Sequence, residues 1–65
     1  MGFSENLKSL RKSNNLDQKD LAKTLNVSAK TISHWETGYT EPSISQLIAL
    51  ANYFKITIDE LVERQ

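Results

Sequence analysis

The chain has 65 residues, 38% hydrophobic and 25% charged, with a formal net charge of zero. This composition is typical of a soluble globular domain rather than a disordered or membrane chain. No apolar run is long enough to cross a bilayer, no secretory signal opens the chain, and zero cysteines exclude disulfides. We therefore expect a single domain over residues 1–65, in the cytoplasm and without a membrane partner.

The first predicted helix covers residues 3–13, where Phe3, Leu7 and Leu10 recur at helical spacing before the breaker Asn14-Asn15. Each later helix is preceded by a side-chain oxygen that can cap it, with an apolar residue just before the cap and another four positions after it. The capping residues are Asp17, Ser28, Ser43 and Thr57, and the last two complete capping boxes with Gln46 and Glu60.

These caps predict four further helices, over residues 18–25, 29–37, 44–54 and 58–64. In the first of them Leu21 and Leu25 face the core, and Ala22 permits close approach of the next helix. Asn26 lies where the chain reverses, and Gly38 suits a left-handed end for residues 29–37. No segment competes as a strand, so the expected fold class is all-α with five helices.

The helix over residues 29–37 has two different faces when successive residues are placed 100° apart with Ile32 toward the core. Ser28, Ala29, Trp35 and Glu36 lie within about 60° of Ile32. Between about 100° and 200° lie Lys30, Ser33, His34 and Thr37. We therefore expect Trp35 to pack in the core rather than stack on a base, and the polar face to stay free.

Nearly the whole chain resembles the helix-turn-helix family of phage repressors and Cro proteins, the bacterial group named for xenobiotic-response-element regulators. The matching pieces are Gln18, Leu21-Ala22, Asn26-Val27-Ser28, Ile32, Trp35-Glu36-Thr37-Gly38, Pro42-Ser43-Ile44, Leu47, Ala51, Phe54 and Ile56 through Leu61. Two residues depart from the pattern: Asn26 stands where glycine is common, and Tyr39 where a basic or small polar residue is frequent. The resemblance implies a lambda-repressor-like DNA-binding domain with the helix-turn-helix at the second and third helices.

The charges are unevenly distributed although they cancel overall. Residues 1–33 hold six basic and three acidic residues, a net charge of +3, and residues 34–65 hold two basic and five acidic residues, a net charge of −3. A basic half that contains the motif would face the phosphates while the acidic half points away. Asymmetry of this size also arises by chance in small proteins.

Given the resemblance, the third helix would read base edges in the major groove. Lys30 and His34 can donate to guanine, Ser33 can donate to either base type, and the methyl group of Ala29 can press on a thymine methyl. The alternatives are a solvated Lys30–His34 pair and a packing role for Ala29. Candidate phosphate contacts lie on both sides of this helix: Gln18, Lys19, Lys23, Ser28, Thr31, Thr37, Tyr39 and Thr40. For Lys19 and Lys23 a solvated helix face is an equal alternative.

Two structural expectations also come with the resemblance. The inward Glu36 needs a cation, which the family pattern places at Arg11, so an Arg11–Glu36 ion pair should tie the first helix to the third. Removing either partner alone should destabilise the protein more than removing both. The implied homodimer surface lies near the fourth and fifth helices, where Tyr53, Ile58 and Val62 are candidates and Phe54 belongs rather to the core.

Enzymatic chemistry has little support, because the chain has one histidine, no cysteine and no glycine-rich phosphate loop. We expect no cofactor, metal or small-molecule ligand. The predicted function is sequence-specific binding of double-stranded DNA by a bacterial or phage regulator, a repressor that occupies a palindromic operator as a homodimer. Alternatives are an antitoxin or restriction-modification controller with the same DNA face, a pure protein-interaction module, and the headpiece of a longer repressor.

Overall fold

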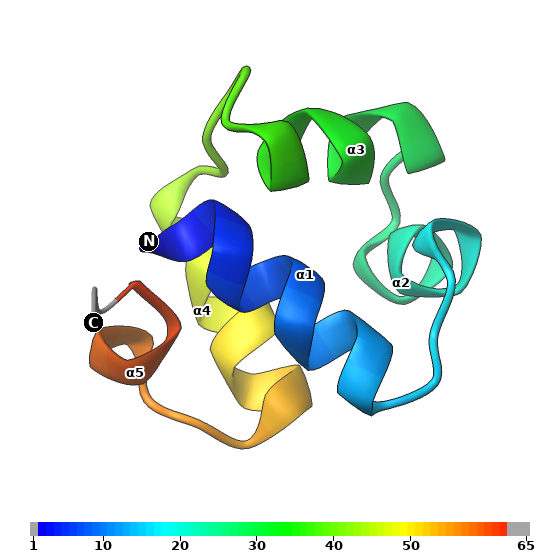
Figure 1. The fold of residues 1–65 in the computed structure, drawn as a ribbon. Coiled ribbons are helices and arrows are strands. Elements are labelled where there is room, and N and C mark those ends of the chain that lie inside the picture. Colours follow the sequence, from blue (N-terminus) through cyan, green and yellow to red (C-terminus); the bar gives the residue numbers. More distant parts are fainter. Residues whose placement is uncertain (1, 63–65) are drawn as a thin grey trace.

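The computed structural model describes residues 2–62, and this part of the chain contains five helices and no strand (Figure 1). The helices are α1 (Phe3–Ser13), α2 (Gln18–Leu25), α3 (Ala29–Thr37), α4 (Ile44–Phe54) and α5 (Ile58–Val62). The all-α prediction is confirmed, and the bounds of the first four helices agree with those predicted. The predicted end of the fifth helix at residue 64 lies outside the described residues.

All four predicted N-caps are present. Asp17, Ser28 and Ser43 accept hydrogen bonds from the backbone N–H three residues later, and Thr57 Oγ1 does the same for Glu60. The boxes Ser43/Gln46 and Thr57/Glu60 form as expected. A third box was not predicted: the Asp20 carboxylate accepts from the Asp17 N–H. The sequence rule looks for Glu or Gln there, but the shorter Asp also reaches.

Three of the four connections between helices share one backbone pattern. Each contains a residue with positive φ, then an apolar residue, then the N-cap of the next helix: Asn15-Leu16-Asp17, Asn26-Val27-Ser28 and Lys55-Ile56-Thr57. The N–H of each apolar residue bonds back to a carbonyl five residues earlier, as in a Schellman motif. These apolar residues pack against the core, so each connection is held to both of its helices.

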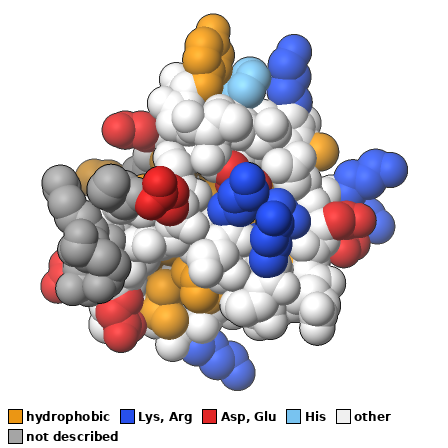
Figure 2. Space-filling view, in the orientation of Figure 1, with side chains coloured by type: hydrophobic (Ala, Val, Ile, Leu, Met, Phe, Trp, Pro, Cys, Tyr) orange, Lys and Arg blue, Asp and Glu red, His pale blue; other side chains and the backbone are white. Residues whose placement is uncertain are grey.

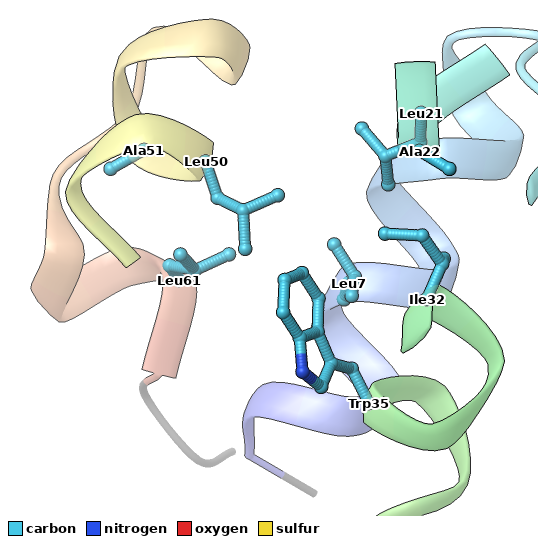
Figure 3. Close-up of a cluster of buried hydrophobic side chains, with 8 residues drawn as sticks. All are labelled: Leu7, Leu21, Ala22, Ile32, Trp35, Leu50, Ala51 and Leu61. Atoms are coloured by element: carbon cyan, nitrogen blue, oxygen red, sulfur yellow. The ribbon is translucent and has the colours of Figure 1, made fainter. Parts of the chain in front are cut away.

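The core takes side chains from all five helices (Figure 3). Leu7, Leu21, Ile32, Leu50 and Leu61 are fully buried, and each contributes about 1.5–3 kcal/mol relative to an exposed position. Trp35 is only 2% exposed, and its ring extends from α3 beside Leu7 toward Leu50 and Leu61, with the Phe3 ring edge-on at a centroid distance of 6.5 Å. Its predicted structural role is confirmed, and α3 is thereby fixed by its inner face.

Candidate nucleic-acid interface

Helix α3 divides into a buried face and a solvent face. Ile32, Trp35 and Glu36 are buried, whereas Lys30 and Thr37 are exposed and Ser33 and His34 keep part of their surface exposed. In Figure 2 the histidine lies beside a lysine or arginine and a hydrophobic side chain at the top of the view, over α3. The polar strip formed by these four residues is therefore accessible from the solvent.

Helix α2 is held against α3 by a three-residue turn. Asn26 has φ 59° and ψ 44°, the left-handed conformation expected for it, and its N–H bonds to the last carbonyls of α2. The next helix starts two residues later at the Ser28 cap, where the Ser28 and Thr31 hydroxyls also lie 3.0 Å apart. Asparagine replaces the usual glycine here at little cost, because it tolerates this conformation better than other non-glycine residues.

A buried ion pair connects α1 to α3. Arg11 Nε donates to Glu36 Oε2 at 2.6 Å and Arg11 Nη2 to Glu36 Oε1 at 3.1 Å, with side-chain exposures of 10% and 3%. This is the pair that the resemblance implied. The Glu36 hydrogen bond raises the pKa of the Arg11 guanidinium, against the lowering effect of burial, and the Glu36 charge adds to the rise. The pair neutralises the single carboxylate of α3 inside the protein.

Gln18, a candidate phosphate contact, takes part in the same network. Its Nε2 donates to Glu36 Oε1 at 3.1 Å, while Arg11 Nη1 donates to the Leu16 carbonyl at 2.8 Å. These contacts were not predicted, because sequence spacing does not show that three side chains from three helices converge. The Gln18 amide is therefore held in one orientation by Glu36.

The other predicted DNA contacts surround α3. Lys19 and Lys23 are exposed on α2, and Thr40 and Tyr39 are exposed after α3. Ala29 is partly buried against the core, so its packing role is present whether or not its methyl group meets a base. The Thr37 hydroxyl donates to the His34 carbonyl at 3.2 Å. In Figure 2 basic side chains lie over α1 at the centre of the view, beside α3 at the top and near α2 at the right, with one more at the bottom. Acidic side chains lie mostly on the left of the view, and one lies among the basic ones at the right.

The predicted dimer residues Tyr53, Ile58 and Val62 are 40%, 37% and 38% exposed. Two further apolar residues on α4 were missed: Ile44 is 73% exposed and Ile48 44% exposed. Their signal was in the sequence, since α4 carries apolar residues around more of its circumference than one buried face requires. Phe54 packs against the core, as expected. The exposed apolar residues among those described are thus found on α4 and α5 as well as at Tyr39 after α3.

Within residues 2–62, no helix combines the length and apolar character needed to cross a membrane. No group of three or more histidine, cysteine or carboxylate residues there has the arrangement of a metal site.

Comparison with known proteins adds independent information. The sequence family described as Helix-turn-helix matches residues 7–61. The HTH-type transcriptional activator BcrR of Enterococcus faecalis is 44% identical over 95% of this chain, which spans 30% of the length of BcrR. The HTH-type transcriptional regulator YqaE of Bacillus subtilis is 34% identical over 94% of this chain, which spans 53% of the length of YqaE.

Solved structures show the same fold. A transcriptional regulator from Listeria innocua has a TM-score of 0.91 and 43% identity over 97% of this chain and 59% of that one. The P22 c2 repressor in complex with the synthetic operator 9T has a TM-score of 0.90 and 32% identity over 97% of this chain and 96% of that one. Hydroxypropylphosphonic acid epoxidase from S. wedmorenis contains a similar region, 32% identical with a TM-score of 0.85, over 32% of its length. A similar fold therefore also occurs as part of an enzyme.

Proposed function

Because the chain belongs to the helix-turn-helix family, we propose that it is a transcriptional regulator that binds double-stranded DNA sequence-specifically through α3 in the major groove. The observation that carries this proposal is the division of α3, whose inner face is buried while Lys30, Ser33, His34 and Thr37 keep exposed surface. A major groove about 12 Å wide admits one helix, and side chains on its outer face then meet the base edges. The protein would act in the cytoplasm, where it meets the chromosome.

In this proposal, one set of residues contacts the DNA bases and another set contacts the DNA phosphates. Lys30 and His34 project from α3 and read base edges, with Ser33 and Ala29 beside them. Lys19, Lys23 and Gln18 contact one strand from α2, and Ser28, Thr31, Thr37 and Thr40 lie at the two ends of α3. The Arg11–Glu36 pair supports this arrangement, because it ties the inner face of α3 to α1 and leaves the outer face free.

A homodimer is the second part of the proposal. One recognition helix reads few base pairs, and dimers of such domains bind half-sites about one helical turn apart, roughly 34–36 Å. The exposed apolar residues of α4 and α5, which include Ile48, Tyr53, Ile58 and Val62, give a second copy a surface away from α3. The operator should then be a palindrome.

Occupation of such an operator would exclude RNA polymerase, so we propose repression as the mode of action. P22 c2 is a repressor, and BcrR is named an activator, so members of both kinds share this fold.

Selection of bound duplexes from a random pool tests the proposal. We expect a symmetric consensus, with affinity that falls as salt rises because bound counterions are released. Lys30→Gln should lose preference at one position of the consensus. The matched control is Lys55→Asn, which removes one positive charge at the α4–α5 turn, far from α3 in Figure 1, and keeps a residue that accepts φ 59°.

Three outcomes would contradict parts of the proposal. Random recovered sequences would show that binding is not sequence-specific. No effect of either Lys30→Gln or His34→Ala would indicate that the polar face of α3 is not used, as in a protein-interaction module. Sedimentation of the protein with a selected duplex that gave one copy per palindrome would exclude the homodimer.

A further inference from the structure

The connection between α3 and α4 differs from the other three. It begins in the same way: Gly38 has φ 82°, the Tyr39 N–H bonds to the His34 carbonyl at 2.9 Å, and the Gly38 N–H bonds to the Trp35 carbonyl at 3.3 Å. In the other connections the apolar residue after the left-handed position packs against the core. Tyr39 is instead 75% exposed, the largest value among the large hydrophobic residues described.

The cause of this difference is the distance from each apolar residue to the next N-cap. Leu16, Val27 and Ile56 directly precede an N-cap, so each is drawn inward between two helices. Tyr39 is separated from the Ser43 cap by three more residues, and Pro42 takes the position before that cap. Tyr39 is therefore not packed between two helices, and its ring stays exposed beside α3.

There the Tyr39 ring contacts His34. The two ring centroids are 4.7 Å apart and the rings are inclined by 58°. The backbone enforces this proximity, because the N–H groups of Tyr39 and Thr40 both bond to the His34 carbonyl, at 2.9 Å and 3.3 Å. A Schellman motif commonly brings these two side-chain positions together. Here the pair stands on the proposed reading face rather than in the core.

We propose that Tyr39 is a positioning residue for base recognition. Its ring holds the His34 imidazole in one orientation, and His34 then contacts the base edge in that orientation. This inference rests on the proposed function and names a specificity determinant within it. An imidazole nitrogen must approach a base edge at a defined angle to discriminate, and an unrestrained ring would lose entropy on binding. The ring contact supplies that restraint before DNA binds. Tyr39 thus acts through its aromatic ring, whereas the sequence alone had suggested its hydroxyl as a phosphate contact.

Tyr39→Ala and Tyr39→Phe separate these two roles. If the ring restrains His34, Tyr39→Ala should lower the ratio of affinities for the consensus and a changed base pair roughly two- to twelvefold, the range for an aromatic pair. The affected base pair should be the one that His34→Ala also affects. Tyr39→Phe should stay within about twofold of the wild type, because the ring is kept. In the His34→Ala background, Tyr39→Ala should have no further effect on discrimination. Each variant is measured on the selected palindrome and on single-base-pair changes of it.

The proposal is overturned if Tyr39→Ala weakens all duplexes equally, or if Tyr39→Phe does as much damage as Tyr39→Ala. Both results would point to a phosphate contact by the hydroxyl. Thermal unfolding of each variant serves as the control for folding, and an exposed residue should leave it nearly unchanged.

A second readout does not use DNA. His34 is the single histidine of the chain, so its imidazole protons give one set of signals in a proton spectrum. The Tyr39 ring should shift them, and the shift should vanish in Tyr39→Ala and persist in Tyr39→Phe. An unchanged shift in Tyr39→Ala overturns the restraint itself. If the wild type selected no consensus, the proposed function would fail while this spectrum still decided whether Tyr39 holds His34.

Discussion

The Arg11–Glu36 pair gives the most decisive test of how this small protein is held together. Glu36→Leu leaves a guanidinium that is 10% exposed with the Leu16 carbonyl as its remaining partner in the network, and Arg11→Met leaves a carboxylate that is 3% exposed. Stranding one charge of a buried pair costs about 3–5 kcal/mol. At about 0.05–0.15 kcal/mol per residue a chain of this size has roughly 3–10 kcal/mol in total. Each single variant should therefore lose between about a third and all of the stability of the wild type.

The double variant Arg11→Met/Glu36→Leu should recover most of that loss. It removes both desolvated charges, and what it forfeits is the bonds to the Leu16 carbonyl and from the Gln18 amide, about 1 kcal/mol each. We expect it within about 2 kcal/mol of the wild type, which implies a coupling free energy of several kcal/mol between the two positions.

Urea titration measures this cycle. Trp35 is the single tryptophan and is buried, so its fluorescence reports the core, and far-ultraviolet circular dichroism reports the helices. Equal m values across the four proteins would license comparison of their unfolding free energies. If the double variant lost as much free energy of unfolding as the two single variants together, the two positions would not be coupled. Our account of the Arg11–Glu36 pair would then be wrong.

Three further predictions concern α2 and the end of α3. Lys23→Gln should weaken binding equally to all duplexes and lower the slope of log affinity against log salt by about 0.9; an unchanged slope would remove it from the phosphate contacts. Gly38→Ala should cost about 1–2 kcal/mol in thermal unfolding from its positive φ, since the added Cβ would meet Ser4 Oγ only at an ordinary 3.5 Å; Gly38→Asn, which tolerates that φ better, should recover part of the loss. The hydrogen bond from the Asp20 N–H lowers the pKa of the Asp17 carboxyl. The stability that this hydrogen bond adds is therefore present above the ordinary pKa of an aspartate and is lost as the pH falls below about 4. In Asp17→Asn that loss on acidification should shrink, and identical acid profiles would refute the assignment.

Local signals predicted most of the backbone. A helix N-terminus is recognised from a few neighbouring residues, so the Ser43 and Thr57 boxes were readable, and the periodicity of α3 placed Trp35 in the core. Lys55 at φ 59° was not predicted, because lysine has no preference for that conformation. It is imposed there by the short distance between the end of α4 and the Thr57 cap.

The candidate site was predictable where it depends on one helix and not where several meet. Lys30 was placed on the outer face of α3 by periodicity alone. The Gln18–Glu36 hydrogen bond and the His34–Tyr39 contact depend on side chains that the turns bring together. The separation of each pair in the sequence did not indicate that its members would be in contact. The Arg11–Glu36 pair was found only through resemblance to a family.

The separation between the two faces of α3 has an evolutionary consequence. None of the eight core residues is Lys30, Ser33 or His34, so these three positions can be exchanged with little loss of folding free energy. New operator preferences are then accessible by single mutations, without compensating changes elsewhere. A gene duplicate of this protein could diverge to control a different promoter while keeping its scaffold intact, and the same tolerance makes it a convenient starting point for laboratory retargeting.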